Sequence, residues 1–358
     1  MTELPAGPGR VTETAGPAAR APGVLRDVFG RTATDLRISL TDKCNLRCTY
    51  CMPAEGLAWL TRVERLHDDE ILHLARVFVD LGVTSVRLTG GEPLVHPTLV
   101  EVIGRLAALQ PRPEISLTTN GISLAEKAAD LVVAGLDRIN VSVDTLDRDR
   151  FISLTRRDRL DDVLAGVAAA AAAGLQPLKI NAVLVRGSNM AEAPRLLDWA
   201  LRSGYRLRFI EHMPLDADHT WSMDEMVTAG EMLELLERDY KLVAHELRGH
   251  APAEEFEVVD GPGRESWVEP TSRVGIIASV TRPFCRDCDR LRLTADGQLR
   301  TCLFAREETD LRGPLRAGAS AAELAEIITT AVAGKQAGHG IGSATFVQPE
   351  RTMSAIGG

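Results

Sequence analysis

The sequence lacks a long apolar run and an apolar N-terminal segment, which argues against a membrane span and a signal peptide. No stretch of the 358 residues approaches the roughly 18 apolar residues of a membrane span. Residues 1–30 are rich in Pro, Gly, Ala and Thr and do not contain the apolar core of a signal peptide. We therefore expect a disordered N-terminal extension, a cytoplasmic location and no contact with a membrane.

Positive charge is scarce as well. The chain has 41 Lys and Arg against 50 Asp and Glu, which gives a net charge of −9. Proteins that bind nucleic acid usually carry a basic patch or stripe, so we expect no nucleic-acid partner. An anionic small molecule would have to be held by a few local arginines and lysines.

Cysteine is also sparse, with six residues that fall into two groups of three. Cys44, Cys48 and Cys51 have the spacing C-x3-C-x2-C on one short loop. Three thiolates on such a loop can ligate three irons of a 4Fe–4S cluster and leave the fourth iron open. A structural zinc site would need a fourth ligand, and disulfides are unusual in a cytosolic chain. A thioredoxin-like C-x2-C would leave Cys44 unexplained.

The second group consists of Cys285, Cys288 and Cys302, with the spacing C-x2-C-x13-C. Again no fourth ligand is near in sequence. A zinc site that borrows His250 or His339 is the alternative, although neither histidine has a ligand-like spacing. We expect a second cluster that also has one open iron.

A repeated unit extends from about residue 35 to residue 218. Six short β-branched or apolar runs, at 36–40, 85–89, 115–118, 138–143, 179–185 and 206–211, alternate with amphipathic stretches that end in glycine. Strands joined by helices run parallel with right-handed crossovers. The pattern predicts an incomplete parallel (β/α)6 barrel over 31–218, whose opening is closed by a C-terminal cluster-binding region, 219–358.

Charged residues within the strands suggest a cavity for an anion. Arg37, Arg87 and Lys179 lie on three different strands, where an unpaired charge is costly unless it faces a cavity. Arg290 and Arg292 alternate with leucines, so the two guanidinium groups share one face of a strand. Each of these residues could alternatively be solvated or ion-paired.

Two motifs carry a resemblance to a known superfamily. Tyr50 precedes the last cysteine of the C-x3-C-x2-C loop, and Thr89-Gly-Gly-Glu-Pro93 follows the second strand. Together they resemble the radical S-adenosylmethionine (radical SAM) superfamily. The second cysteine trio and the terminal segment that ends in Gly357-Gly358 are similar to a narrower family, the GTP 3′,8-cyclases that begin molybdenum-cofactor biosynthesis.

This resemblance implies two 4Fe–4S clusters, S-adenosylmethionine as co-substrate and GTP as substrate. It implies SAM contacts at Tyr50, Gly91, Ser142 and Met213, and a tail that enters the active site through Gly357 and Gly358. It implies GTP contacts at Arg37, Arg87, Thr118, Lys179, Arg290, Leu291 and Arg292. Packing in the core is the alternative role for Tyr50 and Met213.

The implied reaction is that of a lyase. The 5′-deoxyadenosyl radical removes hydrogen from C3′ of GTP, the C3′ radical adds to guanine C8, and the resulting purine radical is reduced. The product, 3′,8-cyclo-7,8-dihydro-GTP, passes to a cyclic pyranopterin monophosphate synthase, and the resemblance suggests a homodimer. A radical SAM enzyme acting on a peptide and a zinc-binding structural or regulatory protein are the alternatives.

Overall fold

The computed structural model describes residues 23–245, 249–268, 272–343 and 346–357. Residues 1–22 of the predicted N-terminal extension and the terminal Gly358 lie outside this range. None of the helices within it is long and apolar enough to cross a membrane.

One 12-stranded sheet organises the chain, in the order β12-β11-β10-β1-β2-β3-β4-β5-β6-β9-β8-β7. The strands β10, β1 to β6 and β9 are parallel, and the remaining strands extend both edges in antiparallel fashion. The strands are β1 (Asp35–Ser39), β2 (Ser85–Thr89), β3 (Glu114–Thr119), β4 (Arg138–Ser142), β5 (Lys179–Leu184), β6 (Arg206–Glu211), β7 (Lys241–Ala244), β8 (Glu254–Asp260), β9 (Arg273–Ile277), β10 (Arg290–Leu293), β11 (Gln298–Arg300) and β12 (Thr309–Asp310).

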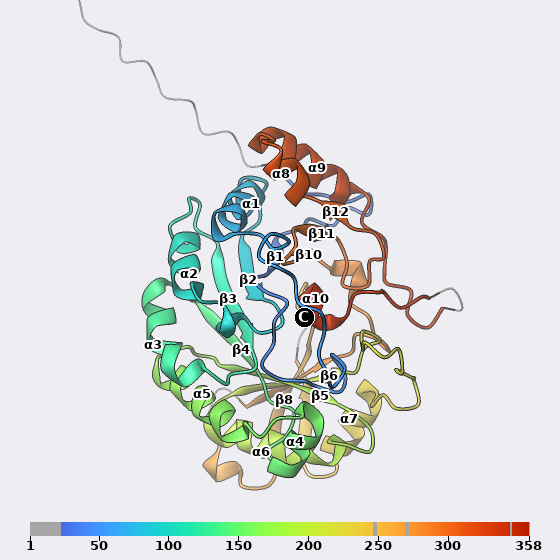
Figure 1. Ribbon diagram of the computed structural model, residues 1–358. Coiled ribbons are helices and arrows are strands. Elements are labelled where there is room, and N and C mark those ends of the chain that lie inside the picture. Colours follow the sequence, from blue (N-terminus) through green and yellow to red (C-terminus); the bar gives the residue numbers. More distant parts are fainter. Residues whose placement is uncertain (1–22, 246–248, 269–271, 344–345, 358) are drawn as a thin grey trace, which may run out of the picture.

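Helices cover the outer face of the curved sheet (Figure 1). They are α1 (Asp68–Asp80), α2 (Leu99–Ala107), α3 (Leu124–Ala134), α4 (Arg148–Thr155), α5 (Leu160–Ala172), α6 (Ala193–Ser203), α7 (Ala229–Leu236), α8 (Arg312–Arg316) and α9 (Ala321–Ala333). A further helix, α10 (Met353–Ile356), does not belong to this outer layer. The predicted parallel β/α architecture, a partial barrel, is confirmed.

The six predicted strands become β1 to β6 because their apolar side chains pack under the helices. In α1, for example, Ile71, Leu74 and Phe78 are all buried at helical spacing, and three acidic residues occupy the first turn. Gly135 and Gly204 end α3 and α6 in the left-handed conformation, which a residue without a Cβ adopts without strain.

The C-terminal part of the chain completes the two edges of the parallel sheet. Strand β10 pairs with β1, and β9 pairs with β6. Helix α10, near the end of the chain, lies beside the strand ends in the middle of the molecule (Figure 1). Residues from both parts therefore meet at the carboxyl ends of the parallel strands, where β/α folds place their chemistry.

Candidate active site

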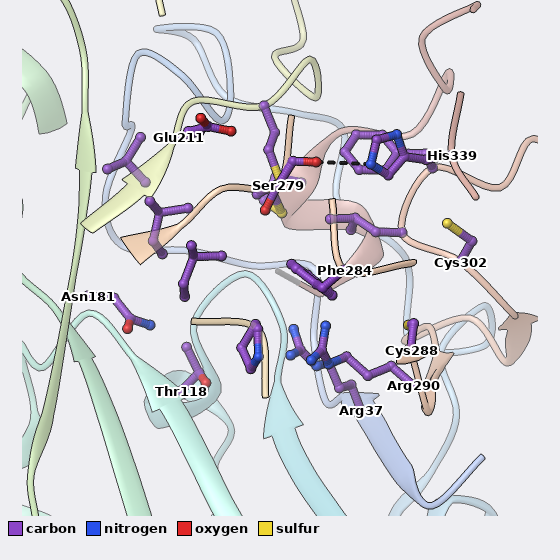
Figure 2. A pocket seen from close by; sticks show the side chains of 18 of the residues that line it. Arg37, Thr118, Asn181, Glu211, Ser279, Phe284, Cys288, Arg290, Cys302 and His339 are labelled. Carbon is purple, nitrogen blue, oxygen red and sulfur yellow. Dashed lines mark hydrogen bonds between the residues drawn. The ribbon is translucent and has the colours of Figure 1, made fainter. Parts of the chain in front are cut away.

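A cavity of about 270 Å³ lies inside the curved sheet, lined by side chains from both parts of the chain. Figure 2 shows Arg37, Arg290 and Cys288 on one side of it, and Thr118 and Asn181 on another. Of the residues that the sequence predicts for the site, the cavity is lined by Tyr50, Ser142, Met213, Arg37, Arg87, Thr118, Arg290, Arg292, Cys285, Cys288 and Cys302.

The first cysteine trio lies in the loop that follows β1. Burial raises the pKa of Cys44 to about 12 and that of Cys51 to about 11, and Cys51 and Cys44 raise the pKa of Cys48 further. The three thiol groups are therefore close enough to influence one another's pKa. The backbone N–H of Leu46 donates to Cys44 Sγ at 3.4 Å, and Ser354 donates to the thiol of Cys51. Cysteine thiols with such amide and hydroxyl donors fit iron–sulfur ligation, in which iron keeps the sulfurs deprotonated.

The predicted glycine motif packs directly against this loop. The N–H of Gly91 donates to Thr41 O at 2.7 Å. A Cβ atom on Gly91 would lie 2.4 Å from Asp42 O, and one on Gly90 would lie 2.4 Å from Thr41 O. Both glycines are therefore required for the close approach of two backbone segments. Gly91 does not line the cavity itself, and its contact with SAM remains a prediction.

The second cysteine trio lies on the cavity wall itself. Burial raises the pKa of Cys302, and Cys285 and Cys288 raise it further, so these three thiols are also neighbours. Lys335 Nζ lies 3.7 Å from Cys288 Sγ. All six cysteines are free. Among the described residues no group of three or more His, Cys, Asp or Glu side chains is arranged to hold a single metal ion, so the fit to a cluster rests on the two thiol trios.

Arginines dominate the wall next to the second trio. Arg37 is paired in register with Arg87 on β2 and with Arg292 on β10, which places the three side chains on one face of the sheet. Burial lowers the pKa of Arg37 to about 9, and the neighbouring Arg87 adds to this effect. Buried Nε atoms of Arg37 and Arg87 have no hydrogen-bond partner, although Asp35 lies 3.9 Å from Arg37 Nε. This cluster of arginines is only partly compensated by Asp35, and such an excess of positive charge favours an anionic ligand.

Three further residues that were predicted to contact GTP differ in their position relative to the cavity. Thr118 lies on the cavity wall and accepts a hydrogen bond from Asn140 Nδ2 at 3.2 Å. Lys179 does not line the cavity, and burial lowers its pKa to about 8 beside several arginines. The side chain of Leu291 is buried in the core, so a contact with GTP there would come from its backbone.

Sequence reasoning missed Arg208 on β6. Arg208 lines the cavity, and it donates to Asn181 Oδ1 at 3.0 Å and to Asn140 Oδ1 at 2.8 Å. Burial lowers its pKa to about 10. The alternation Arg206-Leu207-Arg208-Phe209 was the available signal, because it places both arginines on one face of a strand.

The aromatic residue of the first motif is held by a buried carboxylate that was also missed. Tyr50 Oη donates to Asp144 Oδ2 at 2.5 Å, and Val183 N–H donates to Asp144 Oδ1 at 2.9 Å. Burial raises the pKa of Asp144 to about 6. Asp144 and His212 both line the cavity, and His212 meets the Tyr50 ring edge-on. The position of Tyr50 is thus fixed from two sides.

The C-terminal segment closes this site. Arg351 is ion-paired with Asp296 and Glu308, and the N–H of Met353 donates to Leu215 O at 3.2 Å. Gly357 has a φ of +85°, and an added Cβ would lie 2.7 Å from Thr89 Oγ1. The segment before Gly358 therefore reaches the ends of β1 and β2.

Comparisons with known proteins agree with this arrangement. The Radical SAM superfamily model matches residues 38–200, and the Molybdenum Cofactor Synthesis C model matches residues 205–341. A GTP 3′,8-cyclase from Streptomyces coelicolor is 59% identical over 338 residues, covering 94% of this chain and 96% of the relative. One from Mycolicibacterium smegmatis is 56% identical over 342 residues, covering 95% and 93%. The chain belongs to the GTP 3′,8-cyclase family.

Solved structures agree on the fold. Streptococcus suis SuiB bound to S-adenosylmethionine aligns with a TM-score of 0.52 and 15% identity, covering 78% of this chain and 64% of SuiB. Membership of this family confirms the predicted radical SAM fold and the predicted enzyme class. It also confirms the predicted cofactors, which are iron–sulfur clusters and SAM.

Proposed function

We propose that this chain converts GTP and S-adenosylmethionine to 3′,8-cyclo-7,8-dihydro-GTP, 5′-deoxyadenosine and methionine, the first step of molybdenum-cofactor biosynthesis. One observation supports the proposal above all. A single cavity is lined by the second cysteine trio, by arginines whose buried Nε atoms have no hydrogen-bond partner and by the side chains expected to contact SAM. A nucleotide and SAM bound there would be neighbours.

In this proposal Cys44, Cys48 and Cys51 hold one cluster, and Cys285, Cys288 and Cys302 hold the other. When bound, the first cluster supplies the electron that cleaves SAM to methionine and the 5′-deoxyadenosyl radical. Tyr50, Gly91, Ser142 and Met213 orient SAM. Arg37, Arg87, Thr118, Lys179, Arg290, Leu291 and Arg292 bind GTP, and Arg208 joins them.

The side chains of this site bind and position rather than transfer protons. Arginine binds phosphate oxygens through two parallel N–H groups, so the buried guanidinium groups of Arg37, Arg87 and Arg208 suit a triphosphate. Holding the ribose and the adenosyl group in contact favours hydrogen transfer through proximity.

The C-terminal segment excludes water from the site. Ile356 of α10 packs with Leu215 and Phe304, and Met213 and Cys302 lie against this cluster. A closed, dry cavity protects a radical from reaction with solvent. We propose that Gly357 and Gly358 take part in this closure.

The decisive test is anaerobic turnover with GTP deuterated at C3′. We expect deuterium in the 5′-deoxyadenosine, detected by mass spectrometry, together with a cyclised nucleotide. GTP deuterated at C2′ is the matched control and should give unlabelled 5′-deoxyadenosine. Unlabelled 5′-deoxyadenosine from the C3′ substrate would remove the cyclase assignment.

Iron analysis separates the proposal from its alternatives. Two 4Fe–4S clusters predict about eight irons per chain, whereas a zinc protein holds one or two zinc ions. Turnover of GTP itself distinguishes a cyclase from a radical SAM enzyme that acts on a peptide.

Four further parts of the proposal concern organisation and context. We propose a radical SAM barrel over 31–218, a second-cluster domain over 219–358 and an N-terminal extension over 1–30. We also propose a homodimer, a cytoplasmic location, and transfer of the product to a cyclic pyranopterin monophosphate synthase.

A further inference from the structure

Lys335 lies just beyond the C-terminal end of α9 and points at the second cysteine trio. Only 4% of its surface is exposed. Its Nζ donates to Cys288 O and to Arg290 O, each at 2.9 Å, and lies 3.7 Å from Cys288 Sγ. Three acceptors around Nζ match the three hydrogens of an ammonium group.

None of the three hydrogen-bond partners of Lys335 is a carboxylate. Two are neutral carbonyl oxygens, and the third is the sulfur of a proposed iron ligand. A buried ammonium group needs a nearby negative charge, because desolvation of an isolated cation is costly. A cluster thiolate at Cys288 would supply that charge.

We propose that Lys335 is a positioning residue of the second cluster, which holds Cys288 as a ligand and makes this cluster easier to reduce. The inference rests on the proposed function, since it requires a cluster at Cys285, Cys288 and Cys302. Hydrogen bonds to the sulfurs and local charge set the reduction potential of such clusters. A cation stabilises the more negative, reduced state through its charge.

Lys335 also links the cluster to the nucleotide site. Its bond to Arg290 O anchors the first residue of β10, and the guanidinium group of Arg290 lines the cavity. A change at Lys335 therefore affects both the sulfur of Cys288 and the strand that carries Arg290 and Arg292.

Arg31 provides a matched comparison, because it anchors the same region without touching a sulfur. It donates to Cys285 O at 2.7 Å, to Ala337 O at 3.0 Å and to Gln336 O at 2.6 Å. Its charge is balanced by Asp27 at 2.5 Å. Loss of Arg31 alone would leave the carboxylate of Asp27 unpaired, so the double variant Asp27→Asn/Arg31→Gln, which removes one charge of each sign, should loosen the cysteine loop and leave the net charge near the cluster unchanged.

The experiment uses anaerobically prepared holoenzyme in the wild-type form and in the variants Lys335→Met, Lys335→Arg, Asp27→Asn/Arg31→Gln and Lys241→Met. Lys241 is exposed on β7, so its variant controls for loss of one positive charge. Midpoint potentials come from redox titration followed by electron paramagnetic resonance. The signal that disappears in Cys302→Ser identifies the second cluster. Iron release to a chelator is measured in parallel.

We expect Lys335→Met to shift the potential of the second cluster to more negative values and to speed its iron release about 10–100-fold. Lys335→Arg should restore most of both properties. The double variant Asp27→Asn/Arg31→Gln should speed iron release without shifting the potential, and Lys241→Met should change neither.

Three outcomes would overturn the inference. In the first, the Lys335→Met variant still carries about eight irons, and the potential of its second cluster is unchanged. Another is an equal shift in the double variant Asp27→Asn/Arg31→Gln, which would assign the effect to loop mobility. The third is loss of the second cluster in both Lys335 variants, which would indicate a packing role. A wild-type protein with only one cluster would instead contradict the proposed function itself.

Discussion

The guanidinium group of Arg292 donates a hydrogen bond of 2.7 Å to the carbonyl oxygen of Gly357. Arg292 lies on β10, beside the second cysteine trio, and Gly357 lies in the C-terminal tail. The same tail contributes Ser354, which donates to the thiol of Cys51 in the first trio. One short segment thus contacts the first cysteine group and an arginine beside the second, so its displacement should affect the whole site.

Gly357→Ala should displace the tail. The residue has a φ of +85°, and a Cβ would lie 2.7 Å from Thr89 Oγ1 and 2.8 Å from Ser39 Cβ. We expect GTP turnover to fall about 10–100-fold, as for small misplacements elsewhere in active sites, with the iron content unchanged.

Gly318→Ala is the control for that change. Gly318 has a similar φ of +88°, but nothing lies within 4 Å of its added Cβ. This variant should lose about 1–2 kcal/mol of stability through backbone strain alone and keep its turnover. Equal activity in the two variants would show that crowding at Gly357 has no role.

Arg87→Gln should have opposite effects on stability and on binding. Arg87 is half-buried, its buried Nε has no hydrogen-bond partner, and burial lowers its pKa to about 10 although Asp35 acts to raise it. Removing a desolvated charge that is only partly compensated should raise the melting temperature of the ligand-free protein. The dissociation constant for GTP should rise about tenfold or more, because a charge-assisted hydrogen bond is lost.

Titration calorimetry and thermal melts under nitrogen would measure both effects. Arg138→Gln is the comparison, since Arg138 is half exposed and ion-paired with Glu114 on β3. It should leave GTP affinity nearly unchanged. A lower melting temperature with unchanged affinity in Arg87→Gln would argue for a structural role.

The parts of the fold that depend on local patterns could be predicted from the sequence. The six parallel strands and the glycine-terminated helices follow from side-chain periodicity and helix ends. The pairing of Arg37 with Arg292 could not be predicted. It joins strands far apart in the sequence, and no local period encodes which distant strand completes the edge of a parallel sheet.

The same limit applies to the site. The cysteine trios have diagnostic spacing, whereas Lys335 and Asp144 have none. Lys335 reaches Cys288 because of the way α9 packs, and Asp144 meets Tyr50 across the cavity wall. For Gly91, the sequence predicted a ligand contact, while the geometry adds a second reason, the close approach of the cysteine loop.

Tyr50 and Asp144 should act as one unit in binding SAM. The hydrogen bond between them is 2.5 Å long and lies inside the protein. Tyr50→Phe and Asp144→Asn should each weaken SAM binding about tenfold, and the double variant should be no weaker than either single variant. Equilibrium binding to the anaerobic protein measures this. Additive losses would show that the two residues contact SAM independently.

The tail should be anchored by a carboxylate that stays ionised down to low pH. Arg351 donates to Asp296 Oδ2 at 2.7 Å and to Oδ1 at 3.1 Å. Burial opposes ionisation of Asp296, but hydrogen bonds from Arg351 and Thr294 outweigh it and lower the pKa below the usual 3.8. The contribution of Asp296 to stability is therefore complete above that pH, and it is lost as the pH falls through the lowered pKa.

Asp296→Asn should lack this contribution at every pH. At neutral pH we expect amide hydrogens of residues 352–357 to exchange about tenfold faster in the variant, because a charge-assisted hydrogen bond is lost. In denaturation of the two proteins from pH 7 downward, the stability difference should stay constant until the pH drops below the ordinary range of an aspartate. If the stability difference already shrank between about pH 6 and 5, the pKa of Asp296 would be raised. Arg351 would then not be the dominant influence on this carboxylate.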